Sequence, residues 1–198
     1  MSSISFNPNL TSAPQGTFST TTQGYIQGDF VDDPSIRMEL AAGILDAAIA
    51  QPIWGGMALT ELVPITGEGS LGSTLKLATT PATTTGFSVF TQAYNMIIVP
   101  GNSVQTATAG MTANYFRLGS GARIKVQCSP ALVAAVEGGA IGQQVQWDFA
   151  NQQLIPFAAG TALPVKILSV NTNSKVVSFN SGAGTVSWVP GSAAVILI

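Results

Sequence analysis

The sequence contains no histidine, and only 16 of its 198 residues carry a charged side chain. Histidine is the side chain that most often transfers protons near neutral pH, and it is the commonest metal ligand. Its absence therefore excludes most hydrolase triads and most zinc sites. We expect no catalytic residue, no cofactor and no metal ion in this chain.

Cysteine is almost as scarce. The one cysteine, Cys128, has no partner for a disulfide within the chain and no neighbouring histidine to activate it. It lies in phase with Ile124 and Val126 in an alternating stretch. This phase predicts a small buried side chain on a strand, not a nucleophile.

Charge is low throughout, at 8% of residues against a usual ~25%. The net charge of -2, with only Arg117, Arg123 and Lys125 close together, argues against nucleic-acid binding. A surface with so few charges needs uncharged polar side chains, or partners that cover it. We expect both, as in the subunits of permanent assemblies.

Long hydrophobic runs are also missing. The most helix-like apolar stretch, residues 36–49, is interrupted by Arg37, Glu39 and Asp46 and is shorter than the ~20 residues that a membrane span needs. The N-terminal sequence has no basic segment followed by an apolar run, so it does not read as a secretory signal. We expect no membrane association and no secretory export.

Residues 1–33 are predicted to form an extended polar arm. The first 28 residues carry no charged side chain and are dense in Ser, Thr, Asn, Gln, Gly and Pro. Such a composition disfavours an independent core. Because free termini fray unless something holds them, we expect the arm to lie on a neighbouring subunit or on its own domain.

Residues 34–58 are predicted to form an amphipathic helix and a connector. Two aspartates precede Pro34, which suits the first position of a helix. Ile36, Leu40 and Ile44 then recur at a spacing of four, until a Gln-Pro pair ends the pattern. We expect one helix over residues 34–50 that covers a sheet face or a seam between subunits.

Residues 59–198 are predicted to form a β domain, so the fold is expected to be mainly β, with a sandwich or barrel-like architecture. The clearest alternation, at residues 144–149, precedes a turn at 150–152 and predicts a hairpin. The other predicted strands are residues 75–79, 87–91, 94–99, 115–118, 123–128, 165–170, 176–179, 186–188 and 193–198, with turns at 171–174 and 182–184.

The charges divide unevenly along the chain. Residues 1–75 carry a net charge of about -6 and residues 76–198 about +4, which together give the total of -2. One interpretation is that an acidic arm and helix dock on a more basic β domain, in the same subunit or in a neighbour. The other is that a few exposed charges divide unevenly by chance.

Candidate chemistry is sparse. Glu61 and Glu68 could be the acid pair of a glycosidase, but both lie among turn residues and are better interpreted as solvated acids. Trp147 and Trp188 follow the phase of neighbouring valines, which predicts core positions. Trp54, between a proline and two glycines, is a candidate interface anchor.

The uncharged arm, the short acidic helix and the Gly-, Ala- and Thr-rich β domain with its hairpin at residues 146–156 resemble a capsid cement, or decoration, protein of a tailed bacteriophage. The resemblance implies a structural virion protein, not an enzyme, that binds the major capsid protein on the outer surface of the head and stabilises contacts between capsomers. It also implies assembly in the host cytoplasm and a homo-oligomer, with a trimer favoured and a dimer possible.

In this interpretation the arm and the helix make the contacts with the shell and between subunits. The alternative function is a carbohydrate-binding or adhesive β module of a virion or cell-surface fibre, for which aromatic side chains at Trp54 and Tyr25 are the one indication. The candidate interface residues are Phe6, Phe18, Tyr25, Phe30, Arg37, Leu40, Ile44 and Trp54.

Overall fold

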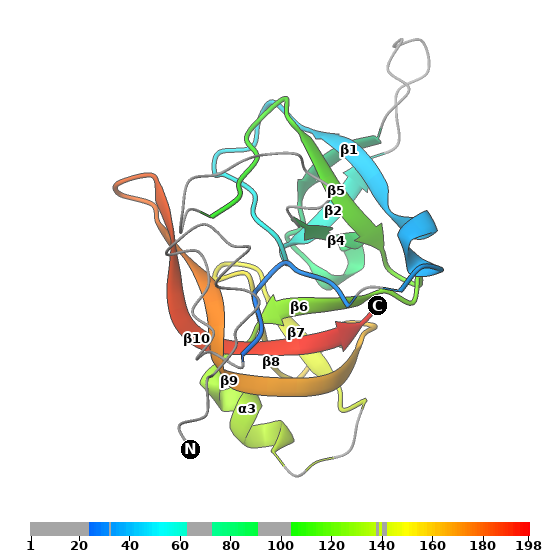
Figure 1. The fold of residues 1–198 in the computed structure, drawn as a ribbon, viewed down its shortest axis with the longest axis vertical. Coiled ribbons are helices and arrows are strands. Elements are labelled where there is room, and N and C mark those ends of the chain that lie inside the picture. The colour runs from blue at the N-terminus through cyan, green and yellow to red at the C-terminus, as the bar shows by residue number, and fades with distance from the viewer. Residues whose placement is uncertain (1–23, 32, 63–72, 91–103, 138, 140–141) are drawn as a thin grey trace, which may run out of the picture.

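The computed structural model describes residues 24–31, 33–62, 73–90, 104–137, 139 and 142–198 (Figure 1). Within these residues the chain forms ten strands, the α-helix α3 (Pro130–Val136) and two 3-10 helices, η1 (Ile36–Glu39) and η2 (Pro81–Thr83). The prediction of a mainly β, barrel-like fold is confirmed. The described residues contain no helix with the length and apolarity that a bilayer span requires.

Five strands close into a barrel in the upper part of Figure 1, in the order β1-β3-β2-β4-β5, with β5 returning to β1. Neighbouring strands are antiparallel except β1 and β3, which are parallel. Leucines and Tyr115 fill the interior, because alternate side chains of each strand point inward. The strands are β1 (Ala41–Leu45), β2 (Ala58–Leu62), β3 (Ser73–Leu77), β4 (Gly86–Val89) and β5 (Thr112–Arg117).

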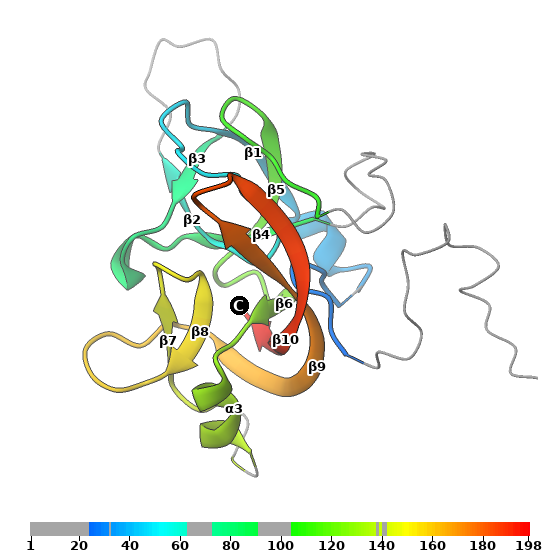
Figure 2. The same ribbon diagram turned by 90° about the vertical axis from the view of Figure 1, so that its left-hand side faces the viewer.

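The second half of the chain forms a sheet below the barrel, in the order β6-β10-β9 (Figure 1). Strands β9 and β10 make one long hairpin that curves up beside the barrel (Figure 2). A smaller hairpin, β7 with β8, lies on the left in Figure 2, and helix α3 lies below it. The strands are β6 (Arg123–Gln127), β7 (Val145–Asp148), β8 (Gln153–Pro156), β9 (Lys166–Asn180) and β10 (Thr185–Leu197).

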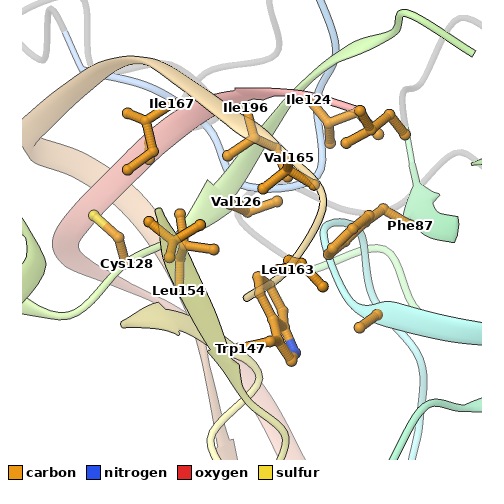
Figure 3. Packing of buried hydrophobic residues seen from close by; sticks show 14 of the residues in the cluster. Phe87, Ile124, Val126, Cys128, Trp147, Leu154, Leu163, Val165, Ile167 and Ile196 are labelled. Carbon is orange, nitrogen blue, oxygen red and sulfur yellow. The ribbon is translucent and has the colours of Figure 1, made fainter. Parts of the chain in front are cut away.

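The two halves share a core. Phe87 of the barrel packs edge-on against Trp147, with ring centroids 5.1 Å apart, among side chains of β6, β8, β9 and β10 (Figure 3). Cys128 is buried in the same cluster, as its phase predicts. Burial raises the pKa of its thiol to about 12, so the sulfur stays protonated at neutral pH.

The predicted helix over residues 34–50 is wrong. Only η1 is helical there, and β1 follows it directly. The physical reason is Gly43, where a Cβ would lie 2.7 Å from Cγ of Leu75. Glycine allows β1 to approach β3 this closely, and the barrel contacts outweigh the weak helical pattern. Since β1 and β2 belong to one barrel, residue 58 is not a structural boundary.

The predicted turn at residues 171–174 is also wrong, because β9 runs through it as one strand. The polar side chains there form local hydrogen bonds: the Ser174 hydroxyl donates to the carbonyl oxygen of Asn171 at 3.1 Å. On the partner strand the register shifts between Gly191 and Ala193. The polar cluster therefore marks an irregularity in a long hairpin, not its end.

Candidate functional site

Residues 25–31, which we call the strap, cross the middle of the molecule between the barrel and the C-terminal sheet (Figure 1). The strap bonds to β9 at Lys175, whose amide donates to Tyr25 at 2.8 Å and whose carbonyl accepts from Gln27 at 3.0 Å. It bonds to β6 through Gly28, Asp29 and Val31, at 2.7, 2.9 and 2.8 Å. The strap therefore joins the outer strands of the three-stranded sheet.

Side chains of the strap also point into the protein. Phe30 is 6% exposed and packs edge-on against Phe116, with ring centroids 5.2 Å apart. Gln27 is buried, and its Oε1 accepts from the amide of Val177 at 2.8 Å. The expectation that Phe30 belongs to an interface is therefore corrected: it is a core residue. The last part of the predicted arm is built into the body.

The strap also touches the barrel through its backbone. Gly28 has a φ of +84°, and a Cβ on it would lie 2.4 Å from Cα of Gly55. Its carbonyl oxygen accepts a hydrogen bond from the amide of Phe90, at 3.1 Å. Only glycine satisfies both this φ and this contact. The strap is thus held from the barrel side as well as from the sheet side.

Four ion pairs join the acidic first part of the chain to the basic second part. Their acids lie between residues 29 and 61 and their bases between residues 76 and 125, so in the described residues these contacts form within one chain. Two pairs join the predicted arm to β6, and the other two lie within the barrel. The pairs are Asp29 with Lys125, Asp33 with Arg123 (3.7 Å), Asp46 with Lys76 (3.4 Å) and Glu61 with Arg117 (2.7 Å).

Glu61 belongs to a polar cluster formed by strands of the barrel. Arg117 donates to both its carboxylate oxygens, each at 2.7 Å, and the Ser73 hydroxyl also donates to it. Arg117 further donates to the hydroxyl of Tyr115 at 3.1 Å. These bonds, those from Arg117 above all, lower the pKa of Glu61 to about 2. A glycosidase acid needs a raised pKa, so Glu61 is poorly suited to that role. Glu68 lies outside the described residues.

The Glu61 cluster predicts a specific acid sensitivity. Because the folded-state pKa is lowered, the cluster stabilises the protein above the ordinary glutamate pKa, and this contribution is lost as the pH falls toward 2. Between about pH 5 and pH 2, we expect the wild type to lose about 1–2 kcal/mol more unfolding free energy than E61Q. Urea denaturation across this range measures the difference. Parallel pH curves for the two proteins would contradict the prediction.

The structure places the predicted interface residues in different environments. Phe6 and Phe18 lie outside the described residues, and Trp54 is a core residue, 4% exposed, 5.8 Å from the ring of Phe179. Tyr25 is half-buried and its hydroxyl bonds to that of Ser169, so Tyr25 and Trp54 do not form an exposed aromatic platform. The remaining candidates are Leu40, which is half-buried, and Arg37 and Ile44, which are exposed.

Two further apolar residues are exposed, and the sequence pattern did not predict them as surface residues. Met38 is 89% exposed and Met111 is 42% exposed, and with Ile44, at 44%, they are the large hydrophobic side chains that the described part of the chain leaves exposed. Met38 lies in η1, just before β1, and the carbonyl of Met111 accepts from the amide of Leu45 at 2.9 Å. The residues of β1 are Ala-Ala-Gly-Ile-Leu, so no alternation of polar and apolar residues in the sequence indicates that Ile44 lies on an outer face.

No metal-ligating group of three or more side chains occurs within the described ranges. Neither protein-family models, nor curated proteins, nor solved structures give a significant match to this chain. Its function therefore has to be inferred from its own residues and their geometry.

Proposed function

We propose that this chain is a capsid cement, or decoration, protein: a structural virion protein that binds the major capsid protein on the outer surface of a phage head and stabilises contacts between capsomers. In this proposal it acts as a homo-oligomer on the virion and performs no catalysis. The observation that carries the proposal is the strap, which anchors an uncharged polar arm in the centre of the folded body.

The anchor suits a protein that bears load. Residues 1–23 carry no charged side chain, and a chain of this length spans about 75 Å when fully extended. A force applied to them passes into the strap, which is bonded to β6 and β9 and has Phe30 in the core. It therefore reaches the whole fold instead of peeling away one edge strand. Clamping neighbouring capsomers requires this kind of connection.

The use of charge also favours an adhesive function. In the described residues eight charged side chains are committed to ion pairs inside the chain, and Glu61 is held ionised by Arg117. With these charges paired internally, we expect contacts with partners to depend largely on uncharged polar and apolar groups. Such contacts are individually weak, and they become strong when a protein spreads them over several subunits of a shell.

Deleting residues 1–23 tests the proposal. We expect the truncated protein to keep its melting temperature within about 2 °C, because the strap remains, and to lose at least about tenfold in occupancy on heads that lack the native protein. A full-length F6S/F18S variant serves as the matched control for side-chain contacts, and should show an intermediate loss. Full occupancy by the truncated protein would refute the role of the arm.

The alternative, a carbohydrate-binding or adhesive module, receives no comparable support. Its candidate aromatics are Trp54, which is in the core, and Tyr25, which is half-buried. Glycan binding by the purified protein, abolished by a substitution at Tyr25, would favour this alternative over the cement protein.

A further inference from the structure

Three buried polar atoms have no hydrogen-bond partner among the residues that the structure describes. They are Nε2 of Gln27, Nε1 of Trp54 and Oε1 of Gln105, in residues that are 2%, 4% and 8% exposed. A buried polar group without a partner destabilises a fold, so native proteins give almost all such groups a protein or a water partner. Atoms of this kind therefore indicate where a small polar ligand binds.

Two touching glycines bring Gln27 and Trp54 together. Gln27 directly precedes Gly28 in the strap, and Trp54 directly precedes Gly55 in the turn before β2. A Cβ on Gly55 would lie 2.5 Å from Cα of Gly28, so the two backbones are in contact. On the next residue, Gly56, a Cβ would lie 3.2 Å from Cγ of Gln27. The Gln27 side chain therefore lies against the chain that follows Trp54.

Strand β9 lies against both side chains. Oε1 of Gln27 accepts a hydrogen bond from the amide of Val177 at 2.8 Å, and the ring centroids of Trp54 and Phe179 are 5.8 Å apart. Val177 and Phe179 are two residues apart on β9, so their side chains point to the same side of the strand. The bond to Val177 also fixes the Gln27 amide, because its oxygen has to face that N–H and its Nε2 has to face away.

Gln105 reaches the same region from a third segment. Ile53, which directly precedes Trp54, forms an antiparallel bridge with Ala107, through two backbone hydrogen bonds of 2.8 Å each. Gln105 lies two residues before Ala107, and Gly55 lies two residues after Ile53. The antiparallel direction therefore carries Gln105 toward Gly55, where the strap and the turn before β2 touch.

We propose that Gln27, Trp54 and Gln105 form a buried site for one water molecule, which bridges the strap to the barrel. The water accepts from Nε2 of Gln27 and from Nε1 of Trp54, and it donates to Oε1 of Gln105. Three hydrogen bonds are the usual number for a buried water. The proposal goes beyond the cement function and does not depend on it.

The mixture of donors and acceptor selects water over an ion. An anion in this site would face the carbonyl oxygen of Gln105, and a cation would face the N–H groups of Gln27 and Trp54. A neutral molecule that both donates and accepts satisfies all three atoms. The water also adds a link behind the contact of Gly28 with Gly55, so the strap is held there by polar bonds as well as by close packing.

The first test is the sign of the stability change in Q105M, because methionine has the length of glutamine but no polar atom that could hold the water. Loss of the acceptor should raise the unfolding equilibrium constant at least ~5-fold in urea denaturation. If Oε1 instead had no partner at all, an apolar replacement would lower that constant. Q144M, at an exposed position, is the matched control and should stay within ~2-fold of the wild type. A Q105M protein as stable as the wild type would overturn the inference.

The second test detects the water directly by NMR, and it covers the possibility that Q105M disturbs the packing. The indole proton of Trp54 is assigned by its loss in W54F. In the wild type it should show cross-peaks with water of opposite sign in laboratory-frame and rotating-frame Overhauser spectra, whereas proton exchange gives the same sign in both. The indole of Trp147, which donates to Gln152 at 3.2 Å, is the internal control and should show none. Absence of the cross-peaks at Trp54 would overturn the inference and leave the cement function untouched.

Discussion

Substituting Gly28 with alanine is expected to destabilise the folded protein by at least about 3 kcal/mol, the sum of a strained backbone and a steric clash. The residue has a φ of +84°, and a Cβ would lie 2.4 Å from Cα of Gly55, where only backbone surrounds it. Neither the strap nor the barrel can move away from this contact without losing the hydrogen bonds of Gly28 to β6 or to Phe90. Denaturant unfolding of G28A measures the loss.

Two further glycines separate the two contributions. Gly55 meets the same contact from the other side, with its Cβ 2.5 Å from Cα of Gly28, and has no positive φ, so G55A tests the clash alone. Gly110 has a φ of +78° and no atom within 4 Å of its Cβ position, so G110A tests the strain alone, at about 1–2 kcal/mol. If G28A were no worse than G110A, the close contact between strap and barrel would be disproved.

The second large effect is expected at Gln152, whose amide connects the β7–β8 hairpin to the barrel. Its Oε1 accepts from the amide of Ala58 and from the indole nitrogen of Trp147, both at 3.2 Å, and its Nε2 donates to the carbonyl of Phe149 at 2.8 Å. Q152M keeps the length of the side chain but leaves two buried donors unpaired. We expect a loss of about 2–4 kcal/mol in unfolding free energy.

Tryptophan fluorescence gives an independent measure of the same substitution, because the indole of Trp147 loses its acceptor in Q152M. The matched control is Q144M, an exposed position just before β7, which should stay within about 0.5 kcal/mol of the wild type. A Q152M protein as stable as Q144M would mean that the hairpin is held by apolar packing alone.

The sequence predicted strands correctly where one face of the strand is buried and the other is exposed to solvent. The hairpin of β7 and β8 is confirmed because Val145 and Trp147 alternate with half-exposed polar residues. The same reasoning placed Cys128 and its neighbours correctly. In these segments local pattern and tertiary environment agree, so pattern alone was sufficient.

The prediction failed where tertiary contacts decide. Ile36, Leu40 and Ile44 have helical spacing, yet Gly43 fits a strand that lies close to β3. Helix α3 was missed, although Ser129 before Pro130 is a start signal and its hydroxyl accepts from the amide of Leu132 at 3.2 Å. A helix of seven residues offers too little periodicity to stand out from the strands around it.

The candidate site was predictable only in outline. The division of charge allowed either a docking of acids of the first part on bases of the second or an uneven distribution by chance, and it did not indicate which residues pair. The strap was not predictable, because its composition matches that of the uncharged arm before it and its partners, Lys125 and Lys175, are far along the chain. Burial of Trp54 likewise depends on Phe179, which no local pattern connects to it.

The position of the strap also affects how this chain is made. Its hydrogen bonds to the C-terminal sheet join residues that are 92 positions apart, for Val31 and Arg123, to 150 positions apart, for Gln27 and Val177, and the most distant partners lie on β9. Contacts of such long sequence separation form slowly, and a ribosome releases the N-terminal residues first. The segment nearest the arm therefore cannot pair with β9 until that strand has been synthesised. We expect the shared core to close only after β10 has also left the ribosome.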